Sequence, residues 1–177
     1  MILNPMRVIF YAGCLLFVLT ILSCANVEKK TEVLKAIDWS AKEVTIPKTD
    51  SLDYGKSYLS VYSQVYSYTE HTALDLTATV SIRNTSETEP IYLIKADYFD
   101  TKGNAIHSYV DQPIALDKME TLEIVIAEFD KKGGTGANFI FEWGKKKSTT
   151  TPLFEAVMIS TYGQQGLSFT TQGKRIE

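Results

Sequence analysis

Leu74–Arg83, with the sequence LDLTATVSIR, is the stretch that decides the fold, because apolar and polar residues alternate along its length. Successive side chains of a β-strand point to opposite faces of a sheet, so a period of two predicts a strand with one buried face. The set expected to face the core consists of the even-numbered apolar residues Leu74, Leu76, Ala78, Val80 and Ile82. The fold is therefore expected to be organised around a half-buried strand at this position.

The segments on either side of this strand are also typical of β-structure. Before it, Leu59, Val61 and Val65 alternate with tyrosines and are expected to be core residues. Six further β-rich segments follow, at residues 91–100, 105–110, 121–129, 138–144, 153–161 and 167–171. No stretch after Asp53 has a sustained 3.6-residue period, so we expect no helix in this part of the chain.

The connections between these segments favour antiparallel pairing. Asp100–Asn104 (DTKGN) is typical of a type I turn closed by a glycine bulge, and Asp130–Gly136 is typical of a longer hairpin loop. Gly163 and Gly173 mark two further turns, and Pro90 suits the first residue of a strand. The spacing of strands and turns predicts an all-β fold, an immunoglobulin-like antiparallel β-sandwich of about 7–8 strands.

The N-terminus has the pattern of a bacterial lipoprotein signal peptide. Arg7 precedes an almost wholly apolar segment, Val8–Leu22, which is shorter than the roughly 20 residues that a membrane-spanning helix needs. Ile21–Cys24 (ILSC) then resembles a lipobox, which implies cleavage after residue 23 and lipidation of Cys24. Each buried acyl methylene contributes about 0.8 kcal/mol, so two or three chains on Cys24 would make membrane attachment effectively permanent. Cys14 would then lie inside the removed peptide; the alternative is an uncleaved signal anchor.

The sequence predicts three parts: a signal peptide at 1–23, a tether at 24–53 and a β-sandwich domain at 54–177. The tether is rich in Lys, Glu, Thr and Ser. Either interpretation of the N-terminus places the domain outside the cytoplasm, with the lipid bilayer as a partner through acylated Cys24. Ala25, rather than Asp, after the cysteine favours the outer membrane or its periplasmic face over the cytoplasmic membrane. We therefore expect a lipid-anchored protein of the bacterial cell envelope.

Composition excludes several classes of chemistry. Once the signal peptide is removed, Cys24 is the only cysteine, and lipidation occupies it, so disulfides, thiol catalysis and cysteine-ligated zinc are excluded. Removal of Arg7 leaves 17 basic and 21 acidic residues, a net charge of −4. The only basic cluster is Lys145–Lys147, so nucleic acid is not an expected partner.

Several short motifs together resemble bacterial domain-of-unknown-function family 3124. They are Val61–Ser63 (VYS), Ser81–Thr85 (SIRNT), Asp97–Asp100 (DYFD), Gly133–Phe139 (GGTGANF), Glu155–Met158 (EAVM) and Gln165–Phe169 (QGLSF). The resemblance extends from about Tyr54 to the C-terminus, and the glycine-rich motif is its most specific part. Phe99 stands where the family more often has Tyr, and Thr135 where it more often has Ser. The resemblance implies a domain boundary near Tyr54 and an envelope setting, and it implies no catalytic activity.

Four tyrosines form the best candidate binding surface. Tyr58, Tyr62, Tyr66 and Tyr68 are predicted to share one strand face, where an aromatic stripe would suit contact with an envelope protein or a glycan. The alternative is that these rings pack against neighbouring strands.

Two polar constellations are further candidates. Arg83, Asn84 and Asp97 lie near strand ends and are predicted to form a cluster, with Arg83 paired to Asp97 and Asn84 bonded to the following turn. A second group, Gly133, Gly134, Gly136 and Asn138, offers consecutive backbone N–H groups that suit an anion, or else forms a glycine-rich hairpin loop.

Metal and hydrolase chemistry remain alternatives. His71, His107, Met119 and Met158 are the side chains that would suit copper or zinc in an envelope metal-handling protein, although no two have a typical ligand spacing. Either histidine could serve a hydrolase as a base, but no serine lies in a nucleophile-elbow pattern. The leading hypothesis is a non-catalytic binding or scaffolding module without a cofactor.

Overall fold

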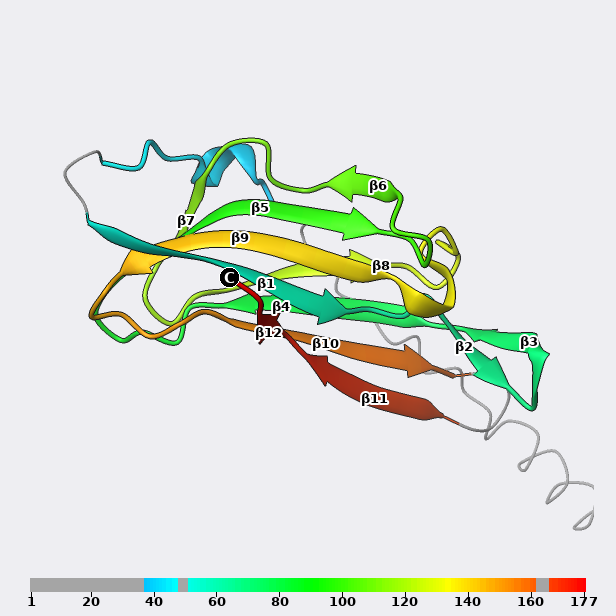
Figure 1. Ribbon diagram of the computed structural model, residues 1–177. Helices are drawn as coiled ribbons and strands as arrows, with labels where there is room; N and C mark the ends of the chain where they lie inside the picture. Colours follow the sequence, from blue (N-terminus) through cyan, green and yellow to red (C-terminus); the bar gives the residue numbers. More distant parts are fainter. Residues whose placement is uncertain (1–36, 48–50, 162–165) are drawn as a thin grey trace, which may run out of the picture. The chain divides into compact units, whose positions relative to one another are not determined.

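The computed structural model of the chain consists of antiparallel strands joined by short connections (Figure 1). It describes residues 37–47, 51–161 and 166–177, so the predicted signal peptide, Cys24 and about half of the predicted tether lie outside the described residues. Within the described ranges no helix is long and apolar enough to cross a membrane. The elements are η1 (Ser40–Lys42), β1 (Leu52–Ser60), β2 (Gln64–Ser67), β3 (Thr69–Asp75), β4 (Thr77–Arg83), β5 (Ile91–Phe99), β6 (Ala105–Ser108), β7 (Ile114–Leu116), β8 (Thr121–Ile126), η2 (Gly134–Gly136), β9 (Asn138–Lys146), β10 (Leu153–Ser160), β11 (Leu167–Gln172) and β12 (Lys174–Arg175).

Two sheets form the layers of the sandwich. The first sheet has the order β12-β1-β9-β5-β6, and β7 also pairs with β5. The second sheet has the order β11-β10-β4-β8, and β2 and β3 form a separate hairpin. Every pairing between named strands is antiparallel. The prediction of an all-β antiparallel sandwich is therefore confirmed.

The central pairings are those of an immunoglobulin-like sandwich, in which strand B pairs with E in one sheet and C pairs with F in the other. Here β4 pairs with β8, and β5 pairs with β9 in the opposite sheet. The flanking strands are exchanged between the sheets: β1 lies beside β9, and β10 lies beside β4. In the constant-type immunoglobulin domain the first strand instead lies beside B and the last beside F.

The core lies between the two sheets, as the alternation predicted. Leu76, Ala78, Val80 and Ile82 are fully buried. Leu74 is only half-buried, because the chain changes pairing at Leu76 and Leu74 belongs to the β2–β3 hairpin. Stacked rings cross the core from Tyr98 through Phe139 and Phe141 to Phe154, with centroids 4.8, 5.4 and 4.3 Å apart. Large aromatic side chains thus join the first sheet to the second.

The single strand predicted around residues 59–68 is broken in the structure. β1 ends at Ser60, and the backbone of the next residues bonds to loops: the Val61 N–H donates to Ala137 O, and the Ser63 N–H donates to Gly134 O. The chain resumes as β2 on a different partner strand. Because of this break and of the short strands β6, β7 and β12, the described residues form twelve strands, whereas 7–8 were predicted.

The turn predictions had mixed outcomes. Asp100–Asn104 is a tight turn between β5 and β6, with Gly103 at a φ of +82°, as predicted. Asp130–Gly136 is not a hairpin loop, because β8 and β9 lie in different sheets and the loop crosses between them. Gly173 also marks a change of sheet, since β11 pairs with β10 while β12 pairs with β1. Gly163 lies outside the described residues.

The folded unit includes residues that were assigned to the tether. Trp39 packs against the core, and its ring lies 6.4 Å from that of Tyr109. The Val44 N–H donates to Pro113 O, and the Lys42 ammonium pairs with the Glu120 carboxylate. The predicted boundary at Tyr54 falls inside β1, because a polar composition alone does not report these contacts.

Candidate functional site

A groove lies at the end of the sandwich where β1 and β10 finish. The β2–β3 hairpin forms one side, and the adjoining ends of β10 and β11 form the other (Figure 1). Its volume is about 480 Å³, within the range of small-molecule sites, roughly 300–1,000 Å³. The described lining residues are Val65, Tyr66, Ser67, Tyr68, Leu74, Ser160, Gly166 and Leu167. None of these side chains is charged.

The β2–β3 hairpin presents aromatic side chains at the groove. Val65 pairs with Leu74 across the hairpin, which places two aliphatic side chains at the lining. The register shifts after Tyr66, and Tyr68 then takes a φ of +64°, which is uncommon for a bulky residue. Tyr66 is 61% exposed and Tyr68 is 98% exposed. The turn therefore holds two large rings in solvent beside an apolar surface.

Ser160 lines the groove, and its hydroxyl is buried. It ends the inward-facing row of β10, after Phe154, Ala156 and Met158, and it is only 5% exposed. Its Oγ has no hydrogen-bond partner among the described residues. Most buried polar groups in proteins are hydrogen-bonded, and leaving one without a partner costs about 1–3 kcal/mol. Thr149 Oγ1, which is outside the groove, also lacks a described partner, and both oxygens are inaccessible to water, so the Ser160 hydroxyl does not by itself indicate a ligand.

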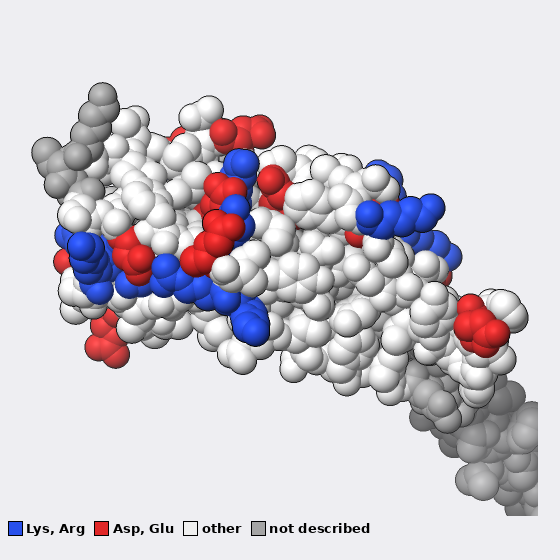
Figure 2. Space-filling view, viewed as in Figure 1, with Lys and Arg blue, Asp and Glu red and all other residues white. Residues whose placement is uncertain are grey.

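The surface around the groove carries few charges. β2 (QVYS) and β11 (LSFTTQ) contain no charged residue. Figure 2 shows charged side chains over the opposite end of the sandwich and a further group at the β2–β3 end, whereas the surface between them is largely uncharged. β3, the other strand of the hairpin, does carry the acidic Glu70 and Asp75, and Asp75 pairs with Lys131 at 2.6 Å.

The four candidate tyrosines do not share one strand face. Tyr66 and Tyr68 line the groove, but Tyr58 lies on β1 in the first sheet. Tyr62 lies in the connection after β1, and its ring packs edge-on against Phe169 at 5.8 Å. The stripe prediction was wrong because the chain leaves β1 between Tyr58 and Tyr62. Packing accounts for Tyr62, and the candidate binding surface is reduced to Tyr66 and Tyr68.

The predicted pair of Arg83 with Asp97 does not form. Arg83 Nε lies 3.1 Å from Glu155 Oε2, because Arg83 and Glu155 are near neighbours on the outer face of the second sheet. Asp97 lies in the first sheet and accepts a hydrogen bond from Ser108 Oγ at 2.7 Å. The two residues are in opposite sheets, which their positions near strand ends did not reveal.

The prediction for Asn84 is confirmed. Its side-chain Oδ1 accepts a hydrogen bond from the Ser86 N–H, and its Nδ2 contacts the carbonyl oxygens of Glu89, Leu116 and Asp117 at 2.9–3.2 Å. These contacts tie the end of β4 to the turn after it and to β7. Asn84 is 2% exposed, so its role is structural.

The glycine-rich loop is occupied by contacts within the protein. The Gly136 N–H donates to Thr101 Oγ1 at 2.9 Å, and the Gly134 N–H donates to Lys131 O at 3.1 Å. A side chain at Gly133 would collide with the hydroxyls of Tyr98 and Ser63, which bond to each other at 3.0 Å. The loop therefore has a packing role, and these N–H groups are not available to an anion. Asn138 begins β9 and pairs with Ser60 and Phe99.

The candidate metal ligands lie on separate elements. His71 is on β3, His107 is on β6 and Met119 is in the turn before β8. Met158 is fully buried in the core on β10. Across the described ranges no group of three or more His, Cys, Asp or Glu residues could hold a metal ion.

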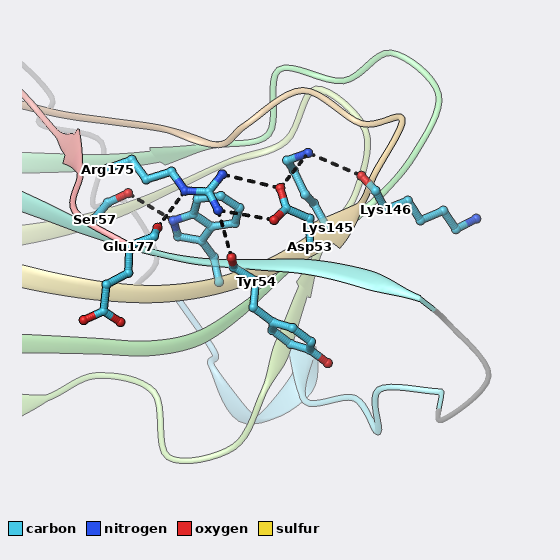
Figure 3. Close-up of polar contacts among 8 residues, drawn as sticks. Asp53, Tyr54, Ser57, Lys145, Lys146, Arg175 and Glu177 are labelled. Carbon is cyan, nitrogen blue, oxygen red and sulfur yellow. Dashed lines mark hydrogen bonds and ion pairs between the residues drawn. The ribbon is translucent and has the colours of Figure 1, made fainter.

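A polar cluster at the start of β1 was not predicted (Figure 3). Arg175 lies 4.9 Å above the buried Trp143 ring, and Asp53 pairs with both Arg175 and the nearly buried Lys145 at 3.2 and 3.3 Å. Arg175, followed by Lys145, holds the pKa of the Asp53 carboxyl below its ordinary value. Trp143 in turn donates to Ser57 Oγ at 3.0 Å. The cluster fastens the C-terminal strand to β1, beside a cavity of about 210 Å³ that Tyr54, Trp143 and Glu177 help to line.

Sequence reasoning missed Ser160 and Leu167, which complete the groove with Tyr66 and Tyr68. The one available signal was Ser160 itself, a polar residue at the end of an otherwise apolar alternating row. A pattern of this kind equally describes a strand that reaches solvent. Only the three-dimensional arrangement shows that the hydroxyl is buried beside the β2–β3 hairpin.

The fold and the groove together define a two-sheet antiparallel β-sandwich with an uncharged groove at one end. The chain belongs to the family described as protein of unknown function (DUF3124), whose model matches residues 54–176. No curated protein matches the chain. Among solved structures, the crystal structure of Thermotoga maritima 1070 is similar with a TM-score of 0.44 and 11% identity, covering 68% of this chain and 92% of that one.

Proposed function

We propose that the protein is a lipid-anchored, non-catalytic binding module of the bacterial cell envelope, and that the groove at the end of the sandwich is its ligand site. The observation that carries the proposal is the groove itself, about 480 Å³ in volume, whose described lining residues are uncharged and include both apolar and hydroxyl side chains. Two exposed tyrosines at the same groove, Tyr66 and Tyr68, supply rigid apolar contact area.

The environment of the Ser160 hydroxyl argues against Ser160 as a nucleophile. A serine hydroxyl reacts only when an adjacent base accepts its proton, and such a base would be its hydrogen-bond partner. Ser160 Oγ has none among the described residues.

The lipoprotein signal supports the envelope setting. The ILSC sequence at residues 21–24 provides the attachment point, and the family model matches the chain from residue 54. A binding module held at a membrane surface needs a stable scaffold and one accessible site. The rigid sandwich and its terminal groove provide both.

Site-specific photo-crosslinking in cells tests this function. A benzophenone side chain introduced at position 68 of the full-length protein should form adducts at the groove, because Tyr68 is 98% exposed and lines it. The matched control is position 125, where Val125 is exposed on the outer face of the second sheet. Equal adduct yields at positions 68 and 125 would count against a ligand site in the groove.

A further inference from the structure

β11 is an edge strand without the protection that such strands normally have. It lies at the margin of the second sheet (Figure 1), and in the described part of the chain β10 is the only strand that pairs with it. An edge strand presents unpaired backbone N–H and C=O groups, which natural proteins protect by a short length, charged side chains, proline or a bulge. β11 (LSFTTQ) has six residues with no charge and no proline, and it pairs with β10 without a register shift. Its outer edge is therefore open to a further strand.

The other edges of the two sheets differ from β11. β8, at the opposite margin of the second sheet, carries the exposed carboxylate of Glu123. In the first sheet, β12 consists only of Lys174 and Arg175, and on the other side β6 and β7 have only four and three residues. Charge or short length thus protects each of these strands, and β11 is the edge best suited to pairing with another chain.

The composition of β11 favours a second copy of the same chain as its partner. In a two-fold dimer the same strand meets itself, so a charged strand would bring like charges together. Ser168 and Thr170 lie on the exposed outer face, whereas Phe169 is on the inner side, where it pairs with Met158. Opposed residues of an antiparallel pair share one face of the sheet, so the two-fold axis passes through either Phe169 or Thr170. Neither register opposes two charges.

We propose that the protein forms a two-fold homodimer in which β11 pairs antiparallel with β11 of a second copy. The second sheets of the two copies then become one continuous sheet. Thr170 lies opposite either Thr170 of the partner subunit or Ser168 of the partner subunit. The contact is made by the backbone edge of β11, so it does not depend on a ligand in the groove.

Cysteine crosslinking tests the contact in isolated membranes. Thr170→Cys in the full-length protein should give a covalent dimer with a short bismaleimide, because position 170 lies opposite itself or diagonal to itself in the two registers. Val125→Cys, on the exposed outer face of β8, is the matched control and should stay monomeric. The protein without an added cysteine controls for Cys14 and Cys24. A dimer yield at position 170 no higher than at position 125 would overturn the proposal.

Charge substitutions test the pairing of β11 with itself. Ser168→Lys together with Thr170→Lys opposes like charges and should raise the dissociation constant of the dimer at least about fivefold. The measurement is sedimentation of the full-length protein in excess non-ionic detergent. Ser168→Glu together with Thr170→Glu should have the same effect, and an equimolar mixture of the two double variants should dimerise again. Both positions are exposed, so the thermal midpoint should change little.

Val157→Lys together with Ile159→Lys is the matched control for these charges. The two residues pair with Thr170 and Ser168 on the same outer face, one strand further from the edge, so the dissociation constant should change little. A larger effect on β10 than on β11 would instead indicate a dimer through the face of the second sheet. That result, a mixture that stays monomeric, or a wild type that is monomeric at every concentration would overturn the pairing of β11 with itself.

Discussion

Asn84 offers a sharp test of the structural account, because one side chain joins three parts of the chain. Its Oδ1 accepts from the Ser86 N–H at 2.9 Å, and its Nδ2 lies 2.9, 3.2 and 2.9 Å from the carbonyl oxygens of Glu89, Leu116 and Asp117. The amide nitrogen carries only two hydrogens, so at most two of its three contacts are full hydrogen bonds. Asn84→Ala therefore removes about three bonds.

The expected loss follows from that count. A typical intramolecular hydrogen bond contributes about 1 kcal/mol, so Asn84→Ala should lower the free energy of unfolding by about 3 kcal/mol. The carbonyl oxygens left without a donor raise this figure, since Asn84 is 2% exposed and water has little access to the site. The value is a large fraction of the roughly 5–15 kcal/mol that stabilises an ordinary domain.

Urea unfolding measures the effect, with the fluorescence of the buried Trp143 as the signal. With a denaturant slope of about 2 kcal/mol per molar urea, the midpoint of the full-length protein in mild non-ionic detergent should fall by about 1.5 M. Asn104→Ala is the matched control, because Asn104 bonds to Asp100 in an exposed turn, and it should cost less than about 1 kcal/mol. A loss below about 1 kcal/mol for Asn84→Ala would refute the reasoning.

Three further predictions concern the anchor, acid stability and the core. Cys24→Ser should release the protein from the membrane fraction or leave it unprocessed, and Cys14→Ser should have no effect; equal membrane retention of both variants would favour the uncleaved signal anchor. Because Arg175 holds the pKa of Asp53 below its ordinary 3.8, the ionised carboxylate stabilises the fold above that pH, and this contribution is lost as pH falls through the lowered value. Asp53→Asn should therefore lower the free energy of unfolding at pH 7, and this free energy should then fall less steeply as the pH drops below about 4. Denaturation curves recorded across this pH range measure the effect, and an unaltered pH dependence would exclude this role. Val61→Asp buries a charge in the core and should abolish the cooperative thermal transition in circular dichroism, so a variant that melts like the wild type would place Val61 outside the core.

The sandwich could be predicted from the sequence because its strands alternate clearly. Leu76, Ala78, Val80 and Ile82 occupy the predicted buried face, and the Asp100–Asn104 turn has the predicted glycine. Period-two alternation states which face is buried, but it does not state where a strand changes partner. The segment from Leu59 to Tyr68 keeps its alternation through such a change, so one strand was predicted where the chain forms β1, a connection and β2.

The sequence alone did not show which side chains of different strands pair with each other. The prediction paired Arg83 with Asp97 because both lie near strand ends, but the pairing depends on which strands are neighbours in a sheet. Asn84 was predicted correctly because its contacts begin in the turn directly after it, where local spacing determines the geometry. The groove depends on two hairpins about 90 residues apart in sequence meeting at one end, a juxtaposition that no local pattern encodes.

The place of the groove relative to the entering chain has a mechanical consequence. The described chain enters at η1, beside β7, and β1 then runs from Leu52 toward the end where the groove lies (Figure 1). A pulling force applied between Leu52 and the groove end of the sandwich would act along β1. β1 is paired with β9 over all nine of its residues, from Leu52 with Lys146 to Ser60 with Asn138. Hydrogen bonds of an antiparallel pair lie across the strands, so such a force shears all of them together instead of opening them one by one. The domain is therefore expected to resist being stretched along this direction.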